Sequence, residues 1–287
     1  MNLVEVMRSV EAAGLGPRRR RNPRRREIKL RPSRQAAADI LVFQRELTSL
    51  LEPIQERMRR DLFPLLERLE PQFLVTDAAV MDDFASEIED ALRQMREDLE
   101  AVNRTRAESI ASNFTARTNK QNRRRFFGSV ESVIGIDLSA VVDDGDLGPV
   151  LRLKTAENVQ LIQSVPEQFL EKIERAVYAS VLQGSVPART LQSRLLELGA
   201  ESLNRAKFIA RDQTAKLTAS LNQQRNMALG IEEFIWRTSK DARVRETHEP
   251  LDGKRFRFDS PPLVGGRRLL PGQDFQCRCR AQPVVNL

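Results

Sequence analysis

The stretch "IEEFIWRTSKDARVRETHEPLDGKRFRFDS", from Ile231 to Ser260, decides the fold of the C-terminal part of the chain. It opens with a short run of β-prone residues, and "RFRF" at 255–258 alternates charged and aromatic side chains with the period of two of a half-buried strand. Between these runs, "PLDG" is a turn signal in which Gly253 is expected to adopt a positive φ. The pattern predicts a small sheet with loops over residues 231–287.

The rarest residues of the chain lie in or close to this stretch. Its only histidine is His248, and its two cysteines follow in "CRCR" as Cys277 and Cys279. These side chains suit zinc, but one residue between the cysteines is shorter than the usual spacing of a zinc knuckle. We therefore expect no cofactor: the histidine donates to a carbonyl or a carboxylate, and the cysteines pack beneath the sheet. The alternative is a structural zinc on His248, Cys277 and Cys279, with Asp241, Asp252 or Asp274 as the fourth ligand.

Charged residues are dense around the same turn. Asp241, Arg243 and Arg245 precede the histidine, while Arg278 and Arg280 flank the cysteines. Carboxylate–guanidinium forks can order loops that a small sheet cannot hold by apolar burial alone. We interpret these residues as ties between loops of the C-terminal module.

The segment before the sheet predicts three successive helices. They run from Ser164 to Gly184, from Ser185 to Gly199 and from Ser202 to Gly230, and the first two begin with a cap residue followed by a proline in the first turn. Upstream, "IGIDLSAVVDDGDLGP" at 134–149 breaks the helical period with glycines, acidic residues and a proline, which predicts a linker. A domain over 150–287 is therefore expected, helical over 150–230.

Two apolar stripes at steps of three and four predict long amphipathic helices over residues 35–133. Pro53 and Pro64 interrupt the first stripe, so this region is a kinked helix or two helices that begin near the prolines. The second helix is expected to begin at a cap, Thr76 or Asp77, and to stop at Gly128. Together they predict an antiparallel hairpin.

Basic residues are concentrated at the N-terminus. Residues 1–34 carry a net charge of +8, and the rest of the chain carries −1. Prolines and like-charge repulsion oppose a helix here, so these residues are expected to form a disordered arm that binds DNA phosphates without reading sequence. The alternatives are a solubilising tail or an arm that docks on an acidic protein surface. The candidate DNA contacts are Arg18, Arg19, Arg20, Arg21, Arg24, Arg25 and Arg26 in the arm, with Arg123, Arg124 and Arg125 in the long helix.

Composition favours a mainly α chain with a small C-terminal α+β module. Hydrophobic residues make up 40% and aromatic residues 5%, which suits extended helices better than a thick sheet core. There is no apolar run of about 18 residues and no signal peptide, so we expect no membrane contact. Two cysteines make a poor disulfide framework, which favours a reducing compartment. No Walker loop, GxSxG elbow or HExxH helix is present, so an enzyme is not expected.

The order of segments over about residues 150–283 resembles the C-terminal domain of the Mu gpF / SPP1 gp7 family of phage minor head proteins. The resemblance lies in "RAKFIARDQTAKLTASLNQQR", in "GIEEFIWRTSKDARVRETHEPLDGKRF" and in "PGQDFQCRC". Many members have a histidine shortly before the paired cysteines, where this chain reads "PGQDFQ", so a metal site inferred from the family loses a ligand. The residues that carry the resemblance are Ala210, Arg211, Asp212, Gln213, Thr214, Gly230, Trp236, Asp241, Arg243, Arg245, His248, Gly253, Pro271, Gly272, Cys277, Arg278 and Cys279.

The resemblance implies a head morphogenesis protein of a tailed bacteriophage or prophage. Such a protein is made in the bacterial cytoplasm and carried inside the capsid near the portal, in contact with packaged DNA. The implied partners are the portal, major capsid or scaffold protein and double-stranded DNA bound without sequence preference. Two alternatives remain. One is a metal-dependent nuclease or toxin-like effector built on the C-terminal module, with His248 as base or a Cys–His nucleophile. The other is a cellular DNA-binding adaptor.

Overall fold

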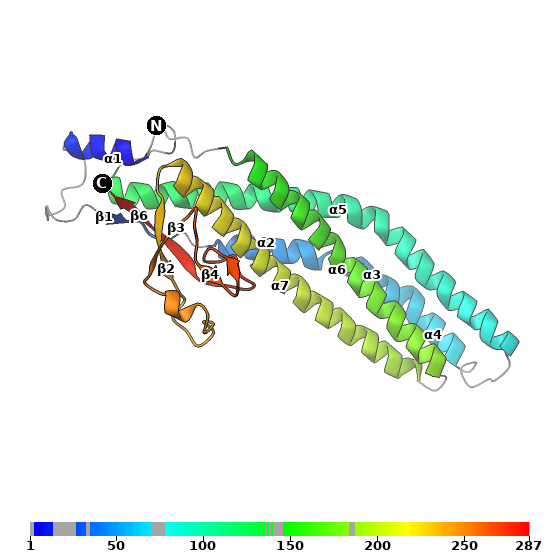
Figure 1. Ribbon diagram of the computed structural model, residues 1–287. Helices are drawn as coiled ribbons and strands as arrows, with labels where there is room; N and C mark the ends of the chain where they lie inside the picture. The colour runs from blue at the N-terminus through cyan, green and yellow to red at the C-terminus, as the bar shows by residue number, and fades with distance from the viewer. Residues whose placement is uncertain are drawn as a thin grey trace. The chain divides into compact units, whose positions relative to one another are not determined.

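The computed structural model of the 287-residue chain describes residues 3–13, 27–32, 35–70, 78–135, 137, 139, 146–183 and 187–286 (Figure 1). Two compact units are each assembled from segments far apart in the sequence. The first comprises Met1–Ile40, Phe114–Lys154 and Arg211–Leu287, and the second comprises Leu41–Asn113 and Thr155–Ala210. The two units are therefore interleaved along the chain.

The chain is mainly helical with a small antiparallel sheet module near its C-terminal end, as predicted. The described helices are α1 (Leu3–Ala12), α2 (Ala37–Thr48), α3 (Glu52–Arg57), the π-helical turn η1 (Met58–Leu62), α4 (Phe63–Leu69), α5 (Ala78–Ile134), α6 (Gly148–Gln183), α7 (Ala188–Ala228) and the 3₁₀ turn η3 (Glu249–Leu251). The described strands are β1 (Glu27–Lys29), β2 (Glu233–Arg237), β3 (Arg255–Arg257), β4 (Leu263–Val264), β5 (Arg267–Arg268) and β6 (Arg280–Asn286).

Helices make up the secondary structure of the described residues of the second unit. Pro53 lies in the first turn of α3, where a missing backbone N–H leaves no helical bond unmade. Pro64 lies in the first turn of α4, which follows the π-helical turn η1 directly, so the helical run from Glu52 to Leu69 continues across this proline with a change in its hydrogen-bond pattern. The first apolar stripe is buried, for example at Ile54 and Leu66. A bidentate pair between Arg96 and Glu174 joins α5 to α6. The expected caps Thr76 and Asp77 lie outside the described residues.

Three predicted helix ends were wrong, and each helix is longer than its pattern suggested. Helix α5 continues through Gly128 to Ile134, α6 begins at Gly148 and includes Pro166, and α7 continues through Gly199. A glycine inside a helix costs only about 1 kcal/mol relative to alanine, which packing can offset. At Gly199 a Cβ atom would lie 2.9 Å from Gln55 Nε2 and 3.4 Å from Phe169 Cζ. This glycine therefore permits a close approach inside a helix and does not end one.

The sheet of the first unit has four antiparallel strands in the order β1-β6-β2-β3 (Figure 1). Strand β2 pairs with β3 so that Phe234 faces Phe256, and Gly253 in the turn between them has φ 77°, as predicted. A two-stranded hairpin of β4 and β5 follows. The small sheet inferred from period-two alternation is confirmed.

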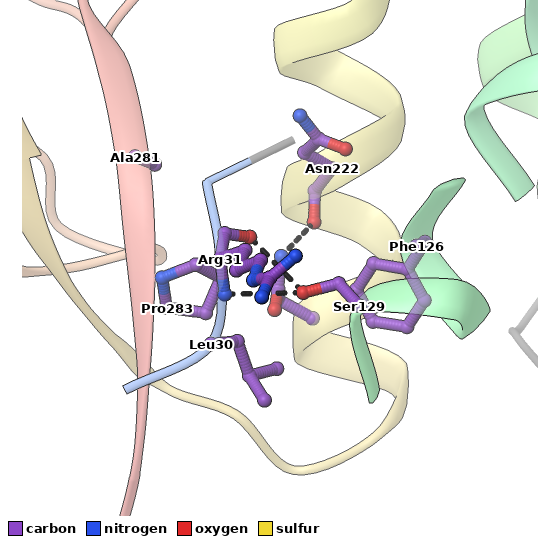
Figure 2. Close-up of a pocket in the computed structure, with 8 residues that line it drawn as sticks. Leu30, Arg31, Phe126, Ser129, Asn222, Ala281 and Pro283 are labelled. Carbon is purple, nitrogen blue, oxygen red and sulfur yellow. Dashed lines mark hydrogen bonds between the residues drawn. The ribbon is translucent and has the colours of Figure 1, made fainter. Parts of the chain in front are cut away.

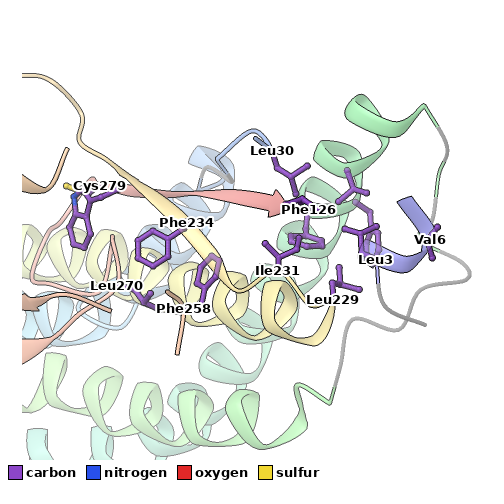
Figure 3. Packing of buried hydrophobic residues seen from close by; sticks show 14 of the residues in the cluster. Leu3, Val6, Leu30, Phe126, Leu229, Ile231, Phe234, Phe258, Leu270 and Cys279 are labelled. Carbon is purple, nitrogen blue, oxygen red and sulfur yellow. The ribbon is translucent and has the colours of Figure 1, made fainter. Parts of the chain in front are cut away.

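An apolar cluster holds this unit together and contains the residues of the candidate site. It includes Phe234, Trp236 and Phe258 from the sheet region, Phe126 from α5, and Cys277 and Cys279. Figure 3 shows Cys279 at one end of this cluster and Leu3 at the other. Its members from β2 and from the segment before β6 are far apart in the sequence, so burial of this cluster fixes how the loops near the end of the chain are arranged.

The prediction of disorder over residues 1–34 was wrong at both ends of that segment. Helix α1 buries Leu3, and β1 pairs with β6, opposite Val284 and Val285. Leu30 is buried in the apolar cluster, and the backbone N–H of Arg31 donates to Ser129 Oγ of α5 at 3.1 Å (Figure 2). Burial of these apolar side chains stabilises the ordered structure on either side of the arginine-rich segment. Arg18, Arg19, Arg20, Arg21, Arg24, Arg25 and Arg26 lie outside the described residues.

Within the described ranges, no helix combines the length and the apolar character needed to cross a membrane.

Candidate functional site

The histidine and both cysteines meet in the interior of the first unit. His248 precedes η3 in the loop between β2 and β3, while Cys277 and Cys279 lie in the loop that ends where β6 begins. His248 Nδ1 is 3.6 Å from Cys277 Sγ and 3.6 Å from Cys279 Sγ. The exposed fractions are 2%, 4% and 7% for His248, Cys277 and Cys279, and both thiols are free. The cysteines do pack in the apolar cluster, as predicted, but they also contact the histidine.

The imidazole ring is held between these thiols and a carboxylate. Its other nitrogen, Nε2, lies 3.3 Å from Asp274 Oδ2 but makes no hydrogen bond to any described residue. The indole of Trp236 packs edge-on against the ring, with 5.5 Å between centroids. The predicted hydrogen bond from the histidine to a carbonyl or a carboxylate is therefore not made among the described residues: Nδ1 faces the two sulfurs, and Nε2 lies near Asp274 without bonding to it.

The two thiols differ in their protonation. A hydrogen bond from the Cys279 thiol lowers the pKa of Cys277 to about 6, and backbone N–H groups of Cys279 and Gly272 act in the same direction. The Cys279 backbone N–H lies 3.4 Å from Cys277 Sγ. Hydrogen bonding to Cys277, together with burial, raises the pKa of Cys279. The shared hydrogen bond therefore shifts the pKa values of the two thiols in opposite directions.

Ion pairs tie the loops around the cluster, as the charge density predicted. Arg278 donates two hydrogen bonds of 2.5 Å to Asp241, and this guanidinium holds the pKa of Asp241 below its ordinary value. Arg245 donates to the Phe275 carbonyl and lies 3.4 Å from Asp274. The side chain of Arg243 is exposed, and its backbone N–H donates to Asp241 Oδ1 at 3.1 Å.

Helix α7 anchors the loop that leads to the cysteines. Asp212 is buried and accepts a 2.8 Å hydrogen bond from the backbone N–H of Gln276, while its other oxygen lies 2.6 Å from Lys216 Nζ. Gln276 is one of the described non-glycine residues with positive φ, at 50°. The neighbouring Gln213 is buried and Arg211 is exposed. Asp212 therefore holds a left-handed residue directly before Cys277.

Two signature residues in the same loop have conformational roles. Gly272 has φ 94°, and a Cβ atom there would lie 3.6 Å from the carbonyl oxygen of Ala215. Pro271 beside it is buried. Positive φ angles of this kind favour glycine because it lacks a Cβ atom. The loop thus reaches α7 closely enough to place the cysteines beneath the sheet.

The structure does not bring the three proposed fourth ligands into the cluster. Asp241 is paired with Arg278, and Asp252 accepts a hydrogen bond from the Thr238 backbone at 2.8 Å. Asp274 lies on the Nε2 side of the histidine, away from the nitrogen that faces sulfur. Among the described residues, the possible ligand atoms that gather within 4.8 Å of one another come from His248, Cys277 and Cys279.

A buried polar network in the same unit was not anticipated from the sequence. Arg225 of α7 is fully buried and donates to the side-chain oxygens of Asn119 and Asn122 on α5. Asn122 in turn donates to Asn222 at 2.8 Å. The sequence does not indicate whether an arginine with apolar neighbours on a helix is buried or exposed to solvent, because its long side chain can lie along apolar surface in either position.

The arginines proposed for DNA contact on α5 have different surroundings. Arg123 packs over the Phe127 ring at 4.8 Å and donates to the Ser139 carbonyl at 2.9 Å. Arg124 and Arg125 are exposed. Lys120, Arg123 and Arg124 line one side of a surface depression. Their role in DNA binding stays a prediction.

Comparisons with known proteins place the candidate site within a family domain. Residues 171–282 match the sequence model of the "Phage Mu protein F like protein" family. The chain is also 32% identical over 288 residues to an uncharacterised protein of Haemophilus influenzae. This match covers 100% of the chain and 59% of that relative, so the chain spans about three fifths of its length. No solved structure matches the chain. His248 and both cysteines lie inside the matched range.

Proposed function

Since residues 171–282 are a domain of the phage Mu protein F like family, we propose that the chain acts in head morphogenesis of a tailed bacteriophage or prophage. The match of this range is the observation that carries the proposal. The matched range includes β2, β3, the turn with Gly253 and the cysteine loop. The proposed location is the capsid interior close to the portal, after synthesis in the bacterial cytoplasm.

The site chemistry supports a structural rather than an enzymatic role. A general base or nucleophile must come within hydrogen-bond distance of its substrate. His248 is 2% exposed, and its imidazole is enclosed by Trp236, both cysteines and Asp274. A phosphodiester could not approach this ring without opening of the fold. Burial therefore argues against the nuclease alternative.

Exposed apolar residues of α6 support a protein partner in the head. Tyr178 and Leu182 are 39% and 84% exposed, and they stand one turn apart on the same helix face. An exposed apolar patch of this kind is typical of a docking surface. The proposed partners are the portal protein and the major capsid or scaffold protein.

The arginines of residues 18–26 complete the proposal with a DNA role. Seven arginines over nine positions would neutralise phosphates of packaged double-stranded DNA without sequence preference. Exposed Arg124 and Arg125 on α5 would add to this electrostatic attraction.

The proposal is tested in the phage or induced prophage that encodes the chain. Mass spectrometry of purified particles should detect the chain in amounts well below those of the major capsid protein. An in-frame deletion of its gene should lower the yield of DNA-filled heads, and a plasmid copy should restore it. Particles that lack the polypeptide, combined with an unchanged yield after deletion, contradict the proposal.

A further inference from the structure

The geometry of the buried cluster points to a zinc ion bound by His248 Nδ1, Cys277 Sγ and Cys279 Sγ. This inference concerns how the C-terminal module is held together, and it stands whether or not the chain acts in head assembly. Zinc bound by thiolate and imidazole is tetrahedral, with bonds of about 2.3 Å to sulfur and about 2.0–2.1 Å to nitrogen. These bond lengths require a sulfur–nitrogen distance of about 3.5–3.6 Å along each edge. Both observed distances are 3.6 Å.

Equal distances from one nitrogen to two sulfurs are hard to explain by hydrogen bonding alone. Nδ1 carries either one proton or one lone pair, so it can make one good hydrogen bond at a time. The second sulfur would then lie 3.6 Å from Nδ1 without a hydrogen bond to the ring. A cation at the shared centre satisfies both sulfurs and the nitrogen together, and it offsets the cost of gathering three polar groups in an apolar cluster.

The far side of the ring provides independent support. Nε2 is buried and makes no hydrogen bond to any described residue, although Asp274 Oδ2 lies 3.3 Å away. A metal on Nδ1 fixes the tautomer that carries its proton on Nε2, facing this carboxylate. Histidine ligands of zinc commonly donate their second nitrogen to a carboxylate in this way. With the metal bound, Asp274 would be the carboxylate to which Nε2 donates, and it is not the fourth ligand.

The backbone is also arranged for a metal-bound thiolate. The Cys279 N–H points at Cys277 Sγ at 3.4 Å, so a main-chain donor is directed at a ligand sulfur. The one-residue spacing that disfavoured zinc is overcome by the fold, because the loop anchored by Asp212 turns both sulfurs toward one point. Soft sulfur with imidazole in a tetrahedral arrangement favours zinc over magnesium or calcium.

The three side chains leave the fourth position of a tetrahedron to a ligand from outside the cluster. A surface cavity is lined by Gly272, Arg278 and Cys279, so it reaches one of the ligand residues. A water molecule from this cavity would complete the tetrahedron. The ion would then tie the loop before η3 to the start of β6, which are about thirty residues apart, and so restrict the unfolded chain.

The test uses the full chain purified under reducing conditions after growth with zinc. Elemental analysis should find one zinc per chain. Cys277→Ser and Cys279→Ser should each lose the metal, and Asp274→Asn should keep it with an affinity lower by about 10- to 100-fold. Val285→Ala is the matched control, because Val285 is buried in the same apolar cluster and offers no ligand. This variant should keep one zinc.

A second measurement tests metal binding with the wild-type protein alone, so its result does not depend on whether the variants fold. Wild-type protein stripped of metal and titrated with Co²⁺ should show sulfur-to-cobalt charge transfer and the visible bands of a tetrahedral site, saturating at one equivalent. Zinc should then displace the cobalt. Wild-type protein that retains no zinc and gives no such spectrum overturns the inference, as does a Cys277→Ser Cys279→Ser variant that still holds one zinc per chain.

Discussion

Asp212 offers the sharpest test of how α7 positions the cysteine loop. Its carboxylate accepts the backbone N–H of Gln276 at 2.8 Å and pairs with Lys216 at 2.6 Å, and it is 4% exposed. Removing the acceptor in Asp212→Ala leaves a partly buried N–H without this partner. Loss of a hydrogen bond to a charged group costs about 1.5–3 kcal/mol. Gln276 is also held at φ 50°, and a left-handed non-glycine residue costs about 1–2 kcal/mol, so the loop has a reason to relax once the bond is lost.

The conservative variant separates the two interactions of the carboxylate. Asp212→Asn keeps an oxygen for Gln276 and loses the charge pair with the partly exposed Lys216 and the long 3.4 Å hydrogen bond from Gln213, which together are worth about 1 kcal/mol. Urea denaturation followed by circular dichroism should therefore rank the free energy of unfolding as wild type, Asp212→Asn, then Asp212→Ala, with a gap of about 2 kcal/mol between the variants. If Asp212→Asn is as unstable as Asp212→Ala, the hydrogen bond to Gln276 is not what holds the loop, and the reasoning fails.

Three further predictions address the turn, the first strand and the arm. Gly253→Ala should lower the free energy of unfolding by about 1–2 kcal/mol, because φ is 77° although no atom blocks a Cβ; a neutral result in urea denaturation would contradict this. A hydrogen bond from Arg255 lowers the pKa of Glu27 in the folded protein. The Glu27–Arg255 pair therefore contributes at most about 1 kcal/mol to the free energy of unfolding above pH 4.5, the ordinary pKa of Glu27, and this contribution is lost as the pH falls through the lower pKa of the folded state. The stability difference between wild type and Glu27→Gln should therefore shrink on acidification, and a difference that grows would oppose the pairing of β1. Deleting residues 17–26 should flatten the slope of log K against log salt for duplex DNA by up to about 6, measured by fluorescence anisotropy, whereas equal slopes would exclude the arm from DNA binding.

Much of the C-terminal module was predictable because its signals are local. The alternation of Arg255 and Phe256 reflects which face of the strand is buried. The glycine at position 253 is favoured because the turn requires a positive φ there. Both involve neighbours in the chain, so the sequence carries them directly. The Asp241–Arg278 pair was also anticipated, since charges crowded near a turn have few other partners.

Helix ends were less predictable for a physical reason. Gly128, Gly184 and Gly199 are similar as stop signals, yet Gly128 and Gly199 lie inside helices. The cost of an internal glycine is small, so packing against other elements decides whether the helix continues. For Gly199 the deciding contacts are with Gln55 and Phe169, which no local window contains.

By itself the sequence determined the mainly α composition, the small sheet, the turn at Gly253 and the kind of side chains that could bind a metal. Only the tertiary structure decided that His248 Nδ1 lies at 3.6 Å from both sulfurs, that Asp274 faces the other nitrogen, and that Ile28 and Leu30 join the apolar core. Short-range preferences act between neighbours in the chain and leave a pattern there. The convergence of residues about thirty positions apart depends instead on which loops close over the shared core, and that is set by the burial of the whole cluster.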